Sequence, residues 1–149
     1  MTNVEQEVQS FTIKKSETIA APAEVVWEAI LHELGPDSGL NPETSMNFKL
    51  EAFPGGRWYR DLGDGVGHLW GYVQVIKPNK VLELTGPMFM SYAATSHVQY
   101  RLVADGTNTR LEFTHTAFGL IPPDVAASVQ GGWGSQLKLI QKRAQERSR

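Results

Sequence analysis

The sequence contains no cysteine among its 149 residues. This absence excludes disulfide bonds, zinc–thiolate sites and thiol nucleophiles, and it is typical of proteins from a reducing compartment. Long apolar runs are missing as well, because no stretch approaches the ~20 apolar residues that a membrane-spanning helix needs. The first ten residues have neither the basic region nor the apolar core of a secretion signal. We therefore predict a cytoplasmic protein without a membrane span.

An excess of positive charge is also lacking, since the formal net charge is -2 and the pI is about 6.1. The balance gives no electrostatic argument for binding nucleic acid. Sequence motifs for common chemistry are absent too: the glycine-rich stretch 63–67 precedes no helix, and neither a GxSxG nor an HExxH motif occurs. We expect no nucleic-acid partner, no metal and no cofactor.

What the sequence does contain is a change of period along the chain. Residues 11–19 are typical of a strand, and apolar residues at helical spacing predict a helix over 22–34, with Pro22 in its first turn. The ten residues before the first strand are polar, and we expect them to be flexible. From 46 to 118 apolar and polar residues alternate, with hairpin signals at "GDGVG" and "DGTN".

The last segment returns to helical spacing. A single apolar stripe runs along it, made of Val125, Val129, Trp133, Leu137, Ile140 and Ala144. The sequence therefore predicts one α+β domain over residues 1–149, with a curved antiparallel sheet of about six to seven strands wrapped around a long C-terminal helix. Side chains often fail to fill the space between such a sheet and its helix, so we expect a pocket there.

Several segments resemble one known superfamily. "TIAAPAEVVWEAI", "FPGGRW", "SHVQYRLVADGTNTRLEFTHTAFG" and "GGWGSQLKLI" occur in the order found in SRPBCC proteins, over residues 11–142. The chain is most similar to the branch of the C-terminal domain of the activator of the heat-shock-protein-90 ATPase. The resemblance implies the helix-grip fold of START lipid-transfer domains and the major birch-pollen allergen. It also implies a small hydrophobic or lipid-like ligand, whereas a co-chaperone role is not favoured because no separate activation domain is recognisable.

Alternation places a set of apolar and aromatic side chains on the inner face of the predicted sheet. Tryptophan and tyrosine combine a large apolar area with a polar end, which suits them to ligand contact. Two methionines in the irregular stretch 86–92 could form a flap at the pocket mouth, or an ordinary packed loop. The predicted ligand-binding residues are Trp58, Arg60, Gly71, Met88, Met90, Tyr100, Phe113, His115 and Trp133.

His115 is the candidate with the most alternatives. It shares its strand face with Leu111 and Phe113, where it could act as a general base, as a polar contact for a ligand, or as a buried imidazole with a hydrogen-bond partner. Arg60 shares the parity of Trp58 and would attract a carboxylate if it points inward, unless the strand bulges after the two glycines.

Three functions thus remain open from the sequence. The preferred one is binding of a small hydrophobic or amphipathic molecule, and the second is a cyclase or hydratase with His115 as base. The third is a protein-interaction module that uses Trp70 and Tyr72, which alternation places on the outer sheet face and which could form a homodimer patch. Glycines at 131, 132 and 134 interrupt the last helix, which indicates a close backbone approach, a kink or a gate.

Overall fold

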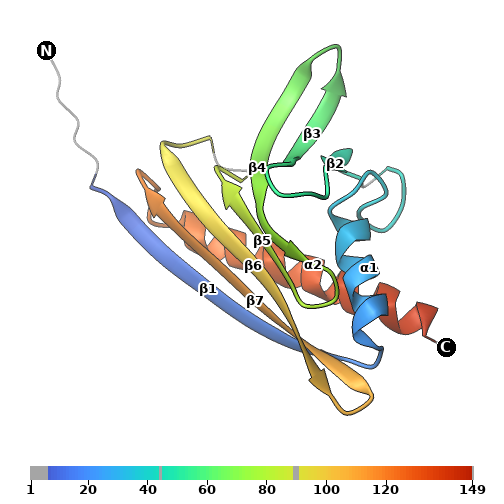
Figure 1. Cartoon of the computed structure of the whole chain (residues 1–149). Helices are drawn as coiled ribbons and strands as arrows, with labels where there is room; N and C mark the ends of the chain where they lie inside the picture. The colour runs from blue at the N-terminus through green and yellow to red at the C-terminus, as the bar shows by residue number, and fades with distance from the viewer. Residues whose placement is uncertain (1–6, 44, 89–90, 149) are drawn as a thin grey trace, which may run out of the picture.

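The structure, a computed structural model, describes residues 7–43, 45–88 and 91–148. All neighbouring strands run antiparallel, in the sheet order β1-β7-β6-β5-β4-β3-β2, and α2 lies along one face of the sheet (Figure 1). The predicted α+β class and helix-grip fold are confirmed. In chain order the elements are β1 (Gln9–Ile19), α1 (Ala23–Glu33), β2 (Phe48–Leu50), β3 (Arg57–Gly63), β4 (Val66–Lys77), β5 (Val81–Gly86), β6 (Ala94–Asp105), β7 (Asn108–Gly119) and α2 (Val125–Arg147).

Two tight turns set the register of the sheet. Asp64 and Gly65, between β3 and β4, have φ values of 54° and 76°, the left-handed pair that a type I′ turn requires. Gly106, between β6 and β7, has a φ of 63°. Because the second turn is this short, Val98 lies opposite His115 in the sheet. The glycine-rich hairpin signals in the sequence therefore predicted both turns correctly.

The edge strand β1 starts earlier than the composition suggests. Gln9 and Ser10 pair with Gly119 and Phe118 of β7, so these two positions of the segment predicted to be flexible are part of the sheet. Polar residues on a solvent-facing edge strand can still form backbone hydrogen bonds with the neighbouring strand. Polarity was therefore a poor indicator of flexibility at these two positions. Residues 1–6 of that segment lie outside the described residues.

The core lies between the concave face of the sheet and α2. Alternate residues of β6 and β7 are buried, as the period of two predicted. The predicted stripe of α2 faces them, with five of its members buried: Val129, Trp133, Leu137, Ile140 and Ala144. In the C-terminal half of α2 the stripe is almost fully buried, since Leu137, Ile140 and Ala144 are at most 1% exposed.

Helix α1 is one residue shorter at each end than predicted. Pro22 is its N-cap, with an extended ψ of 158°, and its carbonyl accepts from the backbone N–H groups of Val25 and Val26. Proline can hold this position because it has no N–H to satisfy. α1 packs against α2 at the C-terminal end of the long helix (Figure 1).

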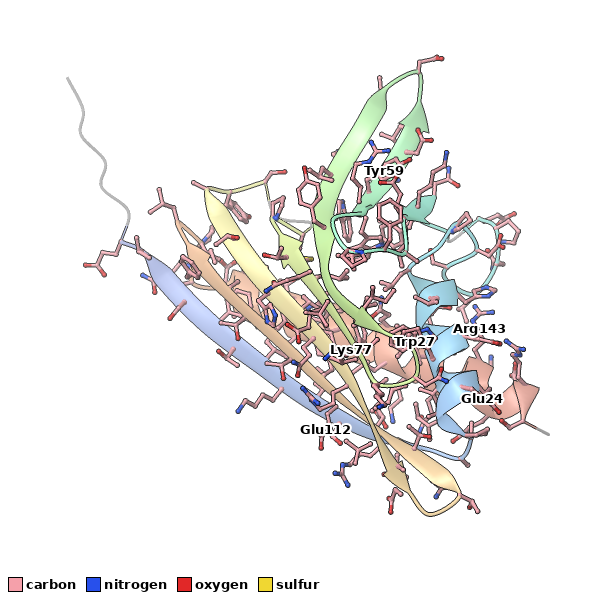
Figure 2. The ribbon with its side chains drawn as sticks, viewed as in Figure 1. Glu24, Trp27, Tyr59, Lys77, Glu112 and Arg143 are labelled. Atoms are coloured by element: carbon pink, nitrogen blue, oxygen red, sulfur yellow. The ribbon has the colours of Figure 1, made fainter. Side chains whose placement is uncertain are left out.

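One buried ion pair joins the two helices and the connection that follows α1. The Glu33 carboxylate is 2% exposed, and its Oε1 accepts from Arg143 Nε at 3.0 Å and Nη2 at 2.7 Å. Its Oε2 accepts from the Gly39 backbone N–H at 3.1 Å. Arg143 is labelled beside α1 in Figure 2. This network fixes the start of the connection that leads to β2.

Replacing Arg143 by alanine is expected to lower the free energy of unfolding by about 2 kcal/mol, because it removes charge-assisted hydrogen bonds from a buried carboxylate. Arg147→Ala is the matched control in the same helix, since Arg147 pairs with Glu28 where both side chains are more than half exposed. That change is expected to cost less than about 1 kcal/mol. Urea unfolding of both variants measures the difference, and equal costs would contradict this account of the network.

Candidate functional site

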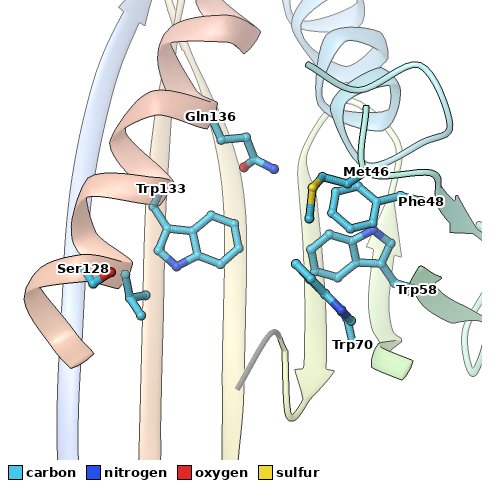
Figure 3. Close-up of a pocket in the computed structure, with 9 residues that line it drawn as sticks. Met46, Phe48, Trp58, Trp70, Ser128, Trp133 and Gln136 are labelled. Atoms are coloured by element: carbon cyan, nitrogen blue, oxygen red, sulfur yellow. The ribbon is translucent and has the colours of Figure 1, made fainter. Parts of the chain in front are cut away.

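A pocket opens between the first half of α2 and the strands β2, β3 and β4. Its volume is about 430 Å³. Figure 3 shows two walls, with Trp133 and Gln136 on the helix facing Met46, Phe48, Trp58 and Trp70. The nine lining residues are Met46, Phe48, Trp58, Trp70, Ser128, Val129, Gly132, Trp133 and Gln136.

The strand wall is a cluster of three aromatic rings. Phe48 lies 5.2 Å from Trp58 and 4.8 Å from Trp70 between ring centroids, and the two indoles lie 5.2 Å apart. Their edge-to-face or tilted geometry is the favourable one for aromatic pairs. Trp58 Nε1 donates to the Leu34 carbonyl at 3.1 Å. The ring of Trp58 is therefore fixed from behind by the end of α1.

Trp70 reaches this wall because of a β-bulge. Trp58 pairs with Gly71 and Tyr59 pairs with Leu69, so Trp70 is an extra residue on β4 without a partner in the register. An extra residue breaks the alternation of faces. Trp70 therefore turns into the pocket although alternation placed it on the outer face, and its neighbour Leu69 is 39% exposed.

On the helix wall, the Trp133 ring is hydrogen-bonded to a buried histidine. Trp133 Nε1 donates to His115 Nδ1 at 2.8 Å, and His115 Nε2 lies 2.9 Å from Ser96 Oγ. Since an indole N–H can only donate, Nδ1 carries no proton, and Nε2 is the protonated nitrogen that donates to Ser96. His115 is 0% exposed, and burial lowers its pKa to about 4. The imidazole is thus neutral at neutral pH.

A second buried group orients the polar end of the pocket. The Tyr100 hydroxyl donates to Gln136 Oε1 at 2.6 Å. Burial raises the pKa of the Tyr100 phenol far above its ordinary value, so the hydroxyl keeps its proton. Because the Gln136 oxygen accepts this proton, its amide nitrogen is the end directed away from Tyr100. In Figure 3 that nitrogen is turned toward the strand wall.

The predicted ligand-binding residues divide into three groups. Trp58 and Trp133 line the pocket, whereas Tyr100, Phe113 and His115 are buried and do not line it. Phe113 supports Trp133 from behind, with ring centroids 4.7 Å apart. These three residues therefore act on the pocket through the side chains that cover them.

The remaining predicted residues lie elsewhere. Gly71 is a point of close approach, since a Cβ there would come within 2.9 Å of the Thr85 carbonyl oxygen and 3.3 Å of the Met88 methyl. Met88 is buried in the core beside it and does not line the pocket. Met90 lies outside the described residues.

Arg60 follows the bulge and points away from the apolar pocket. Its side chain lines a separate hollow of about 450 Å³ on the β3–β4 hairpin, together with Tyr59 and His68. Its Nε atom is buried and has no hydrogen-bond partner among the described residues. The Arg60 guanidinium is thus not placed to pair with the carboxylate of a ligand in the apolar pocket.

Ser128 and Gln136 line the pocket on α2 but went unnoticed in the sequence, whereas Gly132 was noticed only as an interruption of the helix, which in the structure is continuous. Ser128, Gly132 and Gln136 recur every four residues, so they form a stripe beside Val129 and Trp133 on the same side of the helix. A stripe of small and polar residues flanking an apolar one marks the border of a core. The glycine at 132 leaves room, because a Cβ there would meet nothing within 4 Å.

The chemistry that this arrangement offers is recognition of an apolar surface. Both ring nitrogens of His115 are engaged within the protein, and the Trp133 ring covers the imidazole on the pocket side. Among the described residues that line the pocket there is no carboxylate, lysine, arginine or histidine. Within the described residues, no helix is both long and apolar enough to span a membrane.

Comparisons with known proteins agree with this fold. A family model described as "Activator of Hsp90 ATPase homolog 1-like protein" matches residues 20–145. No curated protein matches the chain. Among solved structures, an uncharacterized protein from Rhizobium leguminosarum is 19% identical with a TM-score of 0.72, covering 96% of this chain and 99% of that chain.

Two further solved structures are similar at the same low level of identity. CalU16 from Micromonospora echinospora is 19% identical with a TM-score of 0.64, and the match covers 94% of this chain and 85% of that chain. The Aha1 dimer from Colwellia psychrerythraea is 17% identical with a TM-score of 0.64, covering 91% of this chain and 96% of that chain. At these identities the likeness concerns the fold alone.

Proposed function

The chain belongs to the family of Activator of Hsp90 ATPase homolog 1-like proteins, and from this premise we propose that it binds a small apolar or amphipathic molecule in the pocket between the sheet and α2. The observation that supports this most is the pocket itself. Its volume of about 430 Å³ lies within the range of roughly 300–1,000 Å³ typical of small-molecule sites. Its walls are mostly aromatic or aliphatic, with few polar groups.

The aromatic walls of the pocket are also suited to contact with an apolar ligand. The indole N–H groups of Trp58 and Trp133 are satisfied inside the protein, so their ring faces can contact a ligand without leaving a donor unpaired. Burial of apolar surface contributes about 25 cal/mol per Å². A molecule that covers the four aromatic rings of the two walls therefore gains affinity from contact area.

The other two functions are supported less well. A general base must come within hydrogen-bond reach of the proton it removes, and His115 is separated from the pocket by Trp133. A dimer patch on the outer face was expected to use Trp70 with Tyr72, yet Trp70 lines the pocket and Tyr72 is exposed without it. Of the three functions, ligand binding is therefore the one that the positions of these side chains support best.

The substitution Gly132→Leu is expected to fill part of the pocket and to weaken binding of pyrene, a neutral apolar probe, by at least about tenfold. Gly131→Leu is the matched control, because Gly131 neighbours Gly132 in α2, has nothing within 4 Å of an added Cβ, and does not line the pocket. Both changes replace a helix-interior glycine with a better helix former, so neither is expected to lower stability. Pyrene fluorescence measures binding, and circular dichroism checks the fold.

Equal loss of pyrene binding in both variants, or no loss in either, would contradict the proposed site. Native mass spectrometry of freshly purified protein supplies a second measurement. A co-purifying small molecule that is retained by Gly131→Leu and absent from Gly132→Leu would identify the natural ligand.

A further inference from the structure

The pocket makes no provision for a charged group. None of its nine lining residues is ionisable. Arg60, the residue expected to attract a carboxylate if it pointed inward, lies in the separate hollow on the hairpin. Because an unpaired charge is costly to remove from water, the part of the ligand that enters the pocket must be neutral.

Both walls of the pocket carry aromatic rings. The Trp133 ring stands on one side, and the rings of Phe48, Trp58 and Trp70 stand on the other (Figure 3). Each of these rings packs against another ring within 5.2 Å between centroids, so the two walls are rigid. An aromatic ligand can pack against rings on both walls, because aromatic pairs favour edge-to-face or offset-stacked contact.

The Gln136 amide is a hydrogen-bond donor of the lining that is directed into this space. The Gln136 oxygen is engaged by the Tyr100 hydroxyl, whose proton has no other acceptor among the described residues. The amide nitrogen of Gln136 has no partner in the described part of the chain, and Figure 3 shows it turned toward the opposite wall. The indole N–H groups of Trp58 and Trp133 point into the protein instead.

We propose that Gln136, oriented by Tyr100, selects ligands with a hydrogen-bond acceptor, so that the ligand is a neutral aromatic molecule carrying a carbonyl or equivalent oxygen. This inference rests on the proposed function, because it assigns the polar contact within the same pocket. Gln136 is the specificity-determining residue, and Tyr100 is a positioning residue that acts through it. A ligand without an acceptor leaves the amide N–H groups unpaired on binding.

Three probes with the same ring system test the proposal: pyrene, pyrenecarboxaldehyde and pyrenecarboxylate. The wild-type protein is expected to bind the aldehyde about tenfold more tightly than pyrene, as one net hydrogen bond implies, and to bind the carboxylate more weakly than pyrene. Gln136→Met keeps the length and removes the donor, so it is expected to bind the aldehyde no better than pyrene. Tyr100→Phe is expected to reduce the same preference while pyrene affinity stays within about twofold.

The ratio of aldehyde to pyrene affinity separates this inference from the proposed function. If pyrene binds but the wild-type protein shows no preference for the aldehyde, or if the preference survives in Gln136→Met, Gln136 does not select the ligand. Failure of pyrene to bind the wild-type protein, or binding that is unaffected in Gly132→Leu, would overturn the pocket assignment itself. Preference for the carboxylate over both neutral probes would contradict the requirement for a neutral ligand.

Discussion

Replacing Trp133 by alanine is expected to lower the free energy of unfolding by about 3 kcal/mol and to weaken pyrene binding by at least about tenfold. The indole is buried, packs against Phe113 and supplies the whole aromatic surface of the helix wall. Its removal enlarges the pocket and leaves His115 Nδ1 without its donor. The stability cost lies near the lower end for buried aromatic residues, because one side of the ring already borders the pocket.

Trp133→Phe separates the two roles of this side chain. Phenylalanine keeps a ring against Phe113 but cannot donate to His115, so its stability cost is expected to be about 1–2 kcal/mol, the price of one buried acceptor left unpaired. Pyrene binding is expected to fall less than in Trp133→Ala, because an aromatic wall remains. Chemical denaturation and pyrene titration provide both numbers. If Trp133→Phe lost as much stability and as much pyrene affinity as Trp133→Ala, the aromatic surface of Trp133 would not be the cause of either effect.

Trp133 also illustrates what the sequence could predict. The stripe along α2 and the alternation along β7 placed Trp133 and His115 on facing surfaces, and the structure has them there. The periodicity of the sequence predicts the face on which a side chain lies. It does not predict whether that side chain reaches the pocket surface or is covered by another residue. His115 lies behind Trp133 because the indole is large enough to cover it, a fact that depends on how two distant elements pack.

Trp70 shows the opposite case. A period of two holds only while strands pair one residue to one, and the bulge opposite Trp58 and Tyr59 adds a residue on β4. The glycine that follows Trp70 in "GHLWGY" is a signal for a bulge, but it does not say which residue is the extra one. Gln136 was missed for a related reason, since its role depends on Tyr100 in β6, which lies 36 positions away in the chain.

Acidification is expected to destabilise the protein through His115. Its pKa is about 4 in the folded protein and about 6.5 in an unfolded chain. Between these values the unfolded chain binds a proton that the folded protein does not, so stability falls as the pH is lowered from about 6.5 to 4 and levels off below that. The full loss is about 3 kcal/mol. Protonation of Nδ1 also removes the acceptor for Trp133, so pyrene binding is expected to weaken only as the pH falls through about 4, where the folded protein itself takes up the proton.

His115→Gln is the variant that isolates this effect. Glutamine can accept from one neighbour and donate to another as the neutral imidazole does, but it does not titrate. The variant is expected to be less stable than the wild-type protein at pH 7 and to approach it as the pH falls toward 4. Urea unfolding at several pH values gives the difference between the two proteins, in which the other titrating groups cancel. A constant difference from pH 7 to pH 4 would mean that His115 takes up its proton equally well in the folded and unfolded chain, and burial would then not lower the pKa of the imidazole.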